Sequence, residues 1–214
     1  MVHIKRDIPL LVFAMLVPIV VIVAIAFQSV TPAHILLRDP IVVAATANEC
    51  CAPHFGAVSN LGIIGWSIGC FSVLMAAGVI QANPAPQTAP LRLPFLWATG
   101  AITLIFMLDD LFLLHEWVLP GLGVPEILVL GGYGAVFLAY AVCFRRFIVR
   151  SHFVFFFVAC CLFATSILID LIIGAPPILL EDGAKFMGIF AWSGFAVLNG
   201  VDALRAWQIA PPKR

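Results

Sequence analysis

Six runs of about 20 mostly apolar residues are the feature of this sequence that most limits how the chain can fold. A run of this length is what a helix needs to cross a bilayer, and in lipid only helices or closed barrels satisfy every backbone N–H and C=O group. The runs are continuous and lack the alternation of barrel strands. We therefore predict an all-α polytopic membrane bundle, forming a single transmembrane domain over residues 1–214. The predicted spanning helices cover residues 8–28, 57–80, 94–117, 126–144, 152–174 and 177–207.

The composition supports this assignment. Of the 214 residues, 63% are hydrophobic and 10% are charged, whereas soluble domains average about 45–50% apolar and about 25% charged residues. A formal net charge of zero gives no basic field that would attract nucleic acid, so we expect no nucleic-acid partner. The partner that the composition does predict is the lipid bilayer.

The distribution of basic residues predicts the orientation. With both termini placed in the cytoplasm, most of the basic residues fall on the cytoplasmic side, as the positive-inside rule requires. Most acidic residues then fall on the opposite side, and because acids contribute little to topology, their placement needs another explanation. We predict a protein of the cell inner (plasma) membrane whose site is extracytoplasmic. The basic residues on the cytoplasmic side are Lys5, Arg6, Arg92, Arg145, Arg146, Arg150, Arg205, Lys213 and Arg214.

The first apolar run also fits a second interpretation. Lys5 and Arg6 precede it, and it contains Ala24, Ile25 and Ala26, an A-x-A pattern of the kind that signal peptidase cleaves. The run is long and stays apolar up to that pattern, which favours an uncleaved spanning helix. The topology of the remaining segments is the same under both interpretations.

The third predicted helix ends in a dense group of ionisable residues, in the segment LDDLFLLHEW at 108–117. In a continuous helix, Asp109 and Glu116 share one face, while Asp110 and His115 point away from it by about 100° and about 120°. Asp109 lies roughly 10 Å deeper in the membrane than Glu116. All four side chains could join one site only at a wide polar opening.

Two later helices bring further ionisable residues to the same end of the bundle. Asp170 lies near the outer end of the fifth predicted helix, and the sixth begins with Glu181, Asp182 and Lys185. Ionisable residues inside a membrane are expensive and mark functional sites by default. We therefore expect the outer ends of the third, fifth and sixth predicted helices to form one site.

A mixed set of carboxylates and histidine in this site indicates a divalent metal, by ligand type Zn, Mn or Fe. The predicted ligands are Asp109, His115 and Asp170. The simpler alternative is a helix end where polar groups meet water. That alternative fits Asp109 and Asp170 less well, because both lie deeper than the helix ends.

The predicted catalytic groups are Glu116, Glu181 and Lys185. A glutamate would take the proton of a metal-bound water, and the lysine would offset developing negative charge. The plainer alternative is that Glu181 and Lys185, four residues apart on a helix, form a salt bridge that neutralises both charges. The set as a whole predicts a metal-dependent membrane hydrolase acting on a lipid-like substrate at the outer leaflet.

The connection over residues 29–56 is the only long one, and it carries Cys50, Cys51 and His54. Long loops are usually functional or mobile, so we expect this one to cover the outer site. The spacing of the two cysteines and the histidine could ligate a metal, but no second matching pair exists. A disulfide or free thiols in an outward loop fit the pattern better.

Two other function classes stay open. Buried carboxylates also serve proton- or cation-coupled transporters, although no internal repeat or pair of broken helices in matched halves is visible in this sequence. A small chain with few soluble segments also fits a non-catalytic accessory subunit. That class predicts an oligomeric or membrane-complex partner.

Overall fold

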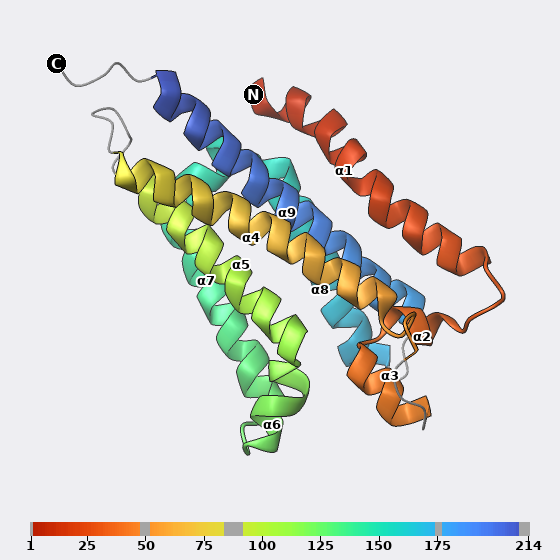
Figure 1. Cartoon of the computed structure of the whole chain (residues 1–214). Coiled ribbons are helices and arrows are strands. Elements are labelled where there is room, and N and C mark those ends of the chain that lie inside the picture. The colour runs from red at the N-terminus through yellow and green to blue at the C-terminus, as the bar shows by residue number, and fades with distance from the viewer. Residues whose placement is uncertain (1, 48–51, 84–91, 174–176, 210–214) are drawn as a thin grey trace. The chain divides into compact units, whose positions relative to one another are not determined.

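The computed structural model describes residues 2–47, 52–83, 92–173 and 177–209 (Figure 1). Within these ranges the regular secondary structure is helical and no strand occurs. Six of the described helices are long and apolar enough to cross a membrane, and the predicted all-α polytopic bundle is therefore confirmed. Their spans are Lys5–Phe27, Ala57–Ala82, Arg92–Phe112, Glu126–Arg150, Phe153–Asp170 and Ile178–Gln208.

The chain divides into two compact units, each described by itself below. The first unit comprises Met1–Gly65 and Val154–Gly194, and the second comprises Trp66–Phe153 and Phe195–Arg214. Helices α4 and α9 each contribute a stretch to both units. The elements in chain order are α1 (Val2–Phe27), α2 (Ala33–Leu37), α3 (Pro40–Ala47), α4 (Ala57–Ala82), α5 (Arg92–Phe112), η1 (Leu114–Val118), α6 (Leu119–Gly121), α7 (Glu126–Arg150), α8 (Phe153–Ile173) and α9 (Ile178–Ile209).

An apolar core in the first unit forms where four helices meet. Ile25 of α1, Leu37 of α2, Val58 of α4 and Phe186 of α9 are all buried in it. Lipid tails are as apolar as these side chains, so close van der Waals packing rather than exclusion from water stabilises such contacts in a membrane protein. The core holds the end of α1 and the starts of α4 and α9 beside the short helix α2.

Glycines let α4 and α9 approach closely in this unit. A Cβ atom at Gly62 would lie 3.1 Å from the Cδ1 atom of Ile189, and one at Gly65 would lie 3.2 Å from its Cγ2 atom. The hydroxyl of Ser193 donates a hydrogen bond to the carbonyl of Gly65 at 2.7 Å. Small residues at the contact and a polar bond across it are the usual means of joining helices in lipid.

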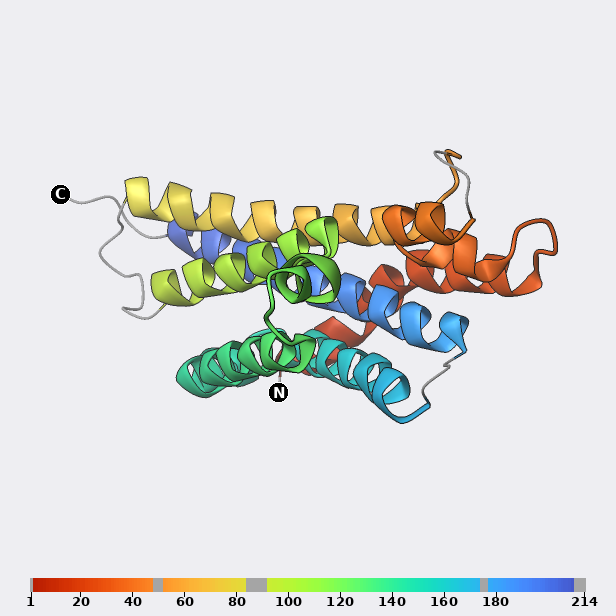
Figure 2. The ribbon, with the colours of Figure 1, turned by 90° about the horizontal axis from the view of Figure 1, so that it is seen from below.

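The second unit is built around Phe95 of α5. Its ring stacks on Phe147 of α7 at a centroid distance of 5.4 Å and meets Phe195 of α9 edge-on at 6.2 Å. One turn further along α5, the Thr99 hydroxyl lies 2.8 Å from the Tyr140 hydroxyl of α7. These contacts place α5 and α7 side by side (Figures 1 and 2).

The third spanning helix ends earlier than predicted. Helix α5 stops at Phe112, and Leu113 adopts a left-handed conformation with φ of 52°. The chain then forms the π-helical turn η1 and the short helix α6, which Figure 2 shows end-on with the loop leading from it to α7. A positive φ cannot continue a right-handed α-helix. The prediction of one continuous helix over residues 94–117 is therefore wrong beyond residue 112.

The long connection over residues 29–56 contains two short helices, α2 and α3. It ends at Gly56, whose φ of 61° and close approach to the Pro40 ring leave no room for a side chain. The Gly56 N–H donates a hydrogen bond to the carbonyl of Ile35 at 2.9 Å, which folds the end of the connection back onto α2. His54 is exposed, whereas Cys50 and Cys51 lie outside the described residues.

Candidate functional site

Asp109 is the centre of the candidate site, which lies in the second unit. It sits one turn before the end of α5 and is 5% exposed. Its Oδ1 atom accepts hydrogen bonds from the backbone N–H of His115 at 3.0 Å and from the hydroxyl of Tyr133 at 2.9 Å. Its Oδ2 atom lies 2.5 Å from Nδ1 of the His115 ring. Both oxygens of this buried carboxylate therefore have polar contacts.

The helix break at Leu113 is what brings His115 to Asp109. In a continuous helix, six residues leave two side chains about 120° apart around the axis. The left-handed residue and the π turn that follows it redirect the chain, so that both the N–H and the ring of His115 face Asp109. The prediction that His115 points away from Asp109 is therefore wrong.

His115 connects the buried carboxylate to an exposed one. Because Nδ1 faces Asp109, the neutral ring carries its proton there and keeps a lone pair on Nε2. Nε2 lies 3.4 Å from Oε1 of Glu116, whose side chain is 35% exposed. A protonated ring can therefore transfer a proton to water by way of Glu116. This arrangement is suited to general acid–base chemistry.

A row of aromatic side chains from three helices lies beside this pair. The ring of Phe106 in α5 is 5.8 Å from that of Trp66 in α4 and 5.8 Å from that of Tyr133 in α7, between centroids. The indole N–H of Trp66 donates a hydrogen bond to Asp110 at 2.7 Å. The second carboxylate of the LDDLF segment is thus held by α4, while the first is held by η1 and α7.

Tyr133 and Trp66 are not among the site residues predicted from the sequence. A signal was available for the tyrosine, because it is one of only two in the chain and lies inside a spanning segment, where a buried hydroxyl usually finds a partner. Spacing along the sequence could not predict that Asp109 is this partner, because Tyr133 and Asp109 lie on different helices.

The other predicted site residues lie in the first unit. Asp170 is exposed on α8, and Glu181 and Lys185 are half-buried on α9. The structure joins Asp109, His115 and Glu116 by direct contacts. The expected convergence of Asp170, Glu181 and Lys185 with these three stays a prediction.

The predicted metal centre also stays a prediction. In the part of the chain that the structure describes, no group of three or more His, Cys, Asp and Glu side chains is arranged to hold a metal ion. Asp109 is engaged through both oxygens, which suits a carboxylate that orients a metal-binding histidine rather than a direct ligand. The atoms of this site that best suit a metal are Nε2 of His115 and the carboxylate of Glu116.

A second histidine–carboxylate pair occurs in the same unit. His152 lies in the turn between α7 and α8, its side chain is fully buried, and its Nε2 is 3.2 Å from Oδ2 of Asp202 in α9. Arg205 lies 4.0 Å from the same carboxylate, and Arg92 at the start of α5 interacts with it electrostatically. The two pairs therefore lie toward opposite ends of α5.

The fold and the site define a class, namely multi-pass helical membrane proteins with a buried carboxylate–histidine pair at the end of a spanning helix. The chain belongs to the family described as "Domain of unknown function (DUF8692)", whose model matches residues 10–198. Comparisons with curated proteins and with solved structures found no match.

Proposed function

We propose that the protein is a membrane hydrolase that acts on a lipid-like substrate, with His115 as its acid–base group. The observation that carries the proposal is the orientation of the His115 ring by Asp109, which is itself held by Tyr133. A general base needs a basic atom at a fixed position within reach of water. The His115 ring supplies the basic atom Nε2, Asp109 holds the ring in position, and the exposed Glu116 connects it to water.

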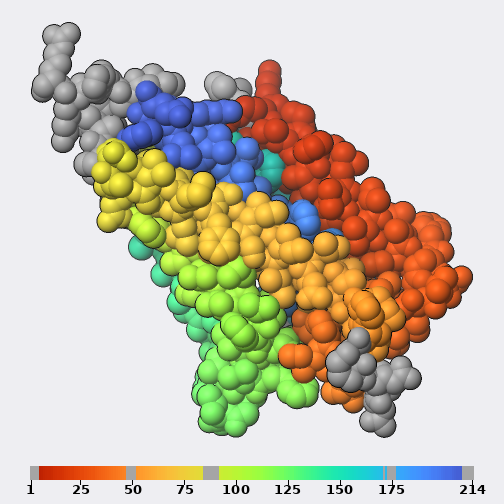
Figure 3. Space-filling view, in the orientation of Figure 1, coloured from red at the N-terminus to blue at the C-terminus, as the bar shows by residue number. Residues whose placement is uncertain are grey.

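The position of the pair at the end of a span supports a lipid-like substrate. Asp109 lies within the span Arg92–Phe112, and the π turn that carries His115 and Glu116 follows directly after it. Figure 3 shows the η1 and α6 region, in green, at the molecular surface. The linkages between the acyl chains and headgroups of lipids lie at this boundary between hydrocarbon and water.

In the proposed reaction, Nε2 of His115 takes a proton from a water molecule as the water attacks the substrate. The Asp109 carboxylate stabilises the imidazolium that forms, and Nε2 then returns the proton to the leaving group. Glu116 exchanges any remaining proton with solvent. Such acid–base catalysis contributes about 10²–10⁴-fold to a rate.

The metal-dependent form of this proposal uses the same residues in different roles. Nε2 of His115 and Glu116 would hold Zn, Mn or Fe, and Asp109 would orient the ring. The bound ion would lower the pKa of its water toward about 7. Elemental analysis of the detergent-purified protein decides between the two forms: a stoichiometric metal that His115→Ala removes supports the metal-dependent form, and its absence from the unmutated protein rejects it.

The test of the hydrolase is product formation in mixed micelles. Purified protein is incubated with diacyl phospholipids of several headgroup classes and with diacylglycerol, and products are detected by mass spectrometry. We expect one class to be cleaved, and His115→Gln and Asp109→Asn each to lower the rate by about 10²–10⁴-fold. The exposed His34 provides a matched control, since His34→Gln should leave the rate unchanged. Absence of cleavage by the unmutated protein, or cleavage that survives His115→Gln, rejects the proposal.

Proton-coupled transport is the second candidate, and the burial of Asp109 inside a span favours it. A carboxylate that shares a histidine and a tyrosine hydroxyl can load and release a proton as its surroundings change. Proteoliposomes that contain a pH-sensitive dye should then show proton uptake that Asp109→Asn abolishes. Uptake at the level of empty liposomes rejects this candidate.

We also propose the orientation that the basic residues predict. Both termini would lie in the cytoplasm, and the site would lie on the extracytoplasmic side of the inner membrane. Six spans in the described residues support termini on one side of the membrane, because an even number of crossings returns the chain to its starting side.

A further inference from the structure

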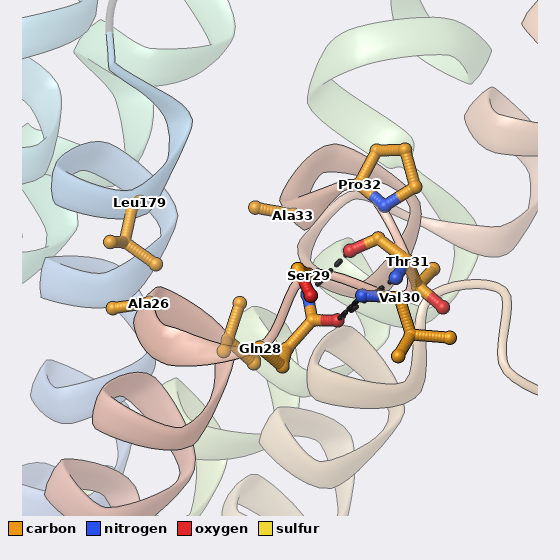
Figure 4. A pocket seen from close by; sticks show the side chains of 9 residues that line it. Ala26, Gln28, Ser29, Val30, Thr31, Pro32, Ala33 and Leu179 are labelled. Atoms are coloured by element: carbon orange, nitrogen blue, oxygen red, sulfur yellow. Dashed lines mark hydrogen bonds between the residues drawn. The ribbon is translucent and has the colours of Figure 1, made fainter.

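A pocket of about 430 Å³ opens in the first unit where α1 ends. Its walls include the apolar residues Ile25 of α1, Val30 of the following turn and Leu179 of α9, together with the polar residues Gln28, Ser29 and Thr31. Figure 4 shows Leu179 and Ala26 on one side and Ala33 on the other. The span of α1 ends at Phe27 and that of α9 begins at Ile178. The pocket therefore lies at the level where hydrocarbon meets headgroups.

The turn that forms one wall of this pocket is held by Gln28. Its side-chain oxygen accepts hydrogen bonds from the N–H groups of Val30 and Thr31, both at 2.9 Å, and its side-chain amide donates to the carbonyl of Thr31. Figure 4 shows these bonds as dashed lines. The wall is thus preformed, which lowers the entropic cost of binding a ligand.

Charged side chains lie on or directly after two of the elements that line the pocket, α9 and α2. Leu179 in the pocket wall and Asp182 are three residues apart on α9, so they lie on the same side of this helix, one turn apart. On the other side of the pocket, α2 begins at Ala33 and is capped by Arg38. The charged group consists of Asp182 and the four side chains with which it interacts electrostatically, Arg38, Asp39, Glu181 and Lys185.

The structure of the connection keeps this charged group in place. Asp39 lies between α2 and α3, and its Oδ1 accepts a hydrogen bond from the Ser59 hydroxyl of α4 at 2.5 Å. The closeness of Gly56 to Pro40 and the packing of Leu37 into the apolar core fix the same stretch of chain. The charges of the connection are therefore tied to α4 and face those of α9 in one folded region.

The charge balance of the group indicates what it would bind. Two cations and three carboxylates give a formal charge of −1, which disfavours a purely anionic headgroup. A zwitterionic headgroup fits both signs, with its phosphate on Arg38 and Lys185 and its amine on the carboxylates. Carboxylates accept hydrogen bonds from a primary ammonium, whereas a choline group has no N–H and prefers aromatic faces, which none of these five residues supplies.

We propose that the pocket and the charged group together bind a phospholipid with an ethanolamine headgroup. The apolar part of the wall, formed by residues such as Ile25, Val30 and Leu179, takes the upper part of an acyl chain. The charged group takes the phosphate and the ammonium. This inference concerns the first unit alone and does not depend on the hydrolase proposed for the second. His115→Gln should abolish hydrolysis and leave this binding unchanged, so the two proposals fail separately.

The test is lipid binding to the detergent-purified full chain by native mass spectrometry. Dioctanoyl phosphatidylethanolamine should bind at least ten times more tightly than the choline and glycerol analogues. Arg38→Gln combined with Lys185→Gln should weaken its binding at least tenfold, and Leu179→Trp, which fills the pocket, should do the same. Arg145→Gln is the control for loss of an exposed cation and should leave the binding unchanged.

A weaker headgroup preference in an Asp182 variant gives a second, sharper readout. Asp182→Asn removes a carboxylate acceptor and one negative charge, so the preference for ethanolamine over glycerol headgroups should fall at least fivefold while the protein stays folded. Equal binding of all three lipids, or binding indifferent to the Arg38, Lys185 and Asp182 variants, overturns the proposal. Equally tight binding of glycerophosphoethanolamine, which has no acyl chains, would overturn the assignment to a lipid in favour of a soluble ligand.

Discussion

Leu113 shows how one residue determines the geometry of a site without taking part in its chemistry. With φ of 52° it ends α5, and it is only 3% exposed. A bulky residue in this conformation is uncommon and costs about 1–2 kcal/mol. The resulting turn sets His115 against Asp109.

Two substitutions at Leu113 separate the effect of side-chain size on stability from the effect of backbone conformation. Leu113→Met keeps the volume and an unbranched Cβ, so it should change the free energy of unfolding by less than about 1.5 kcal/mol. Leu113→Ile places a branched Cβ at a positive φ and should cost about 1–2 kcal/mol more. Unfolding by SDS in mixed micelles measures both values. Equal stabilities of the two variants would show that the left-handed conformation does not disfavour a branched Cβ at position 113.

Tyr133 and Tyr140 are a natural pair for testing the hydrogen bond to Asp109. Tyr133→Phe removes a donor from a buried carboxylate and should lower the free energy of unfolding by about 1.5–3 kcal/mol, because bonds to charged groups are stronger than neutral ones. Tyr140→Phe removes a bond to the neutral Thr99 hydroxyl and should cost about 1 kcal/mol. SDS unfolding of the two variants would contradict this assignment if Tyr140→Phe proved the more costly.

Between helices, close contacts in each unit depend on glycine, which has no side chain to keep the helices apart. A Cβ atom at Gly194 of α9 would lie 2.5 Å from the Phe155 ring of α8, and one at Gly100 of α5 would overlap the side chain of Leu74 in α4. A flexible leucine can move aside, whereas a buried aromatic ring must shift as a whole. Glycine is therefore a packing requirement at Gly194.

The glycine at position 194 has a matched control on α7. Gly194→Ala should destabilise the protein by about 1–3 kcal/mol, since overpacking forces the Phe155 ring and the backbone to shift. A Cβ atom added at Gly134 would meet no neighbour within 4 Å, so Gly134→Ala should be neutral or stabilise by up to about 1 kcal/mol through helix propensity. SDS unfolding of both variants checks the difference. A Gly194→Ala variant as stable as Gly134→Ala would show that packing does not require glycine at position 194.

In the molecule as a whole, the described polar groups lie near the ends of individual spans. In the first unit, the pocket adjoins the end of α1. In the second unit, the Asp109 site lies at the end of α5, and the His152–Asp202 pair lies toward the other end of that helix. In the orientation that we propose, the first two face away from the cytoplasm. Basic residues such as Arg145, Arg146 and Arg150 lie toward the end of α7, where the positive-inside rule expects them.

Reporter fusions test this orientation directly. A reporter active only in the cytoplasm should work at both termini, whereas one active only outside should work when inserted at the exposed Leu122 between η1 and α7. The measurement is reporter activity normalised to the amount of fusion protein. Activity of the two termini on opposite sides would contradict an even number of crossings, and activity of both outside would reverse the proposed orientation.

The sequence predicted the spans well because hydrophobic length is a local property. A helix in lipid satisfies its own backbone, so each apolar run could be assigned without knowledge of its neighbours. Asp109, His115 and Glu116 were placed in one segment in the same way. The prediction that one helix continues through Leu113 was wrong, because an apolar leucine carries no sequence signal for a left-handed conformation.

The amino-acid sequence was enough to predict an all-α membrane bundle with ionisable residues near the ends of its spans. Which of these residues contact one another depends on the tertiary structure. Tyr133 reaches Asp109 from another helix, Trp66 reaches Asp110, and His115 returns to Asp109 through a break in the helix. Periodicity fixes directions around one regular helix axis, whereas contacts between helices and across breaks depend on packing that no single segment encodes.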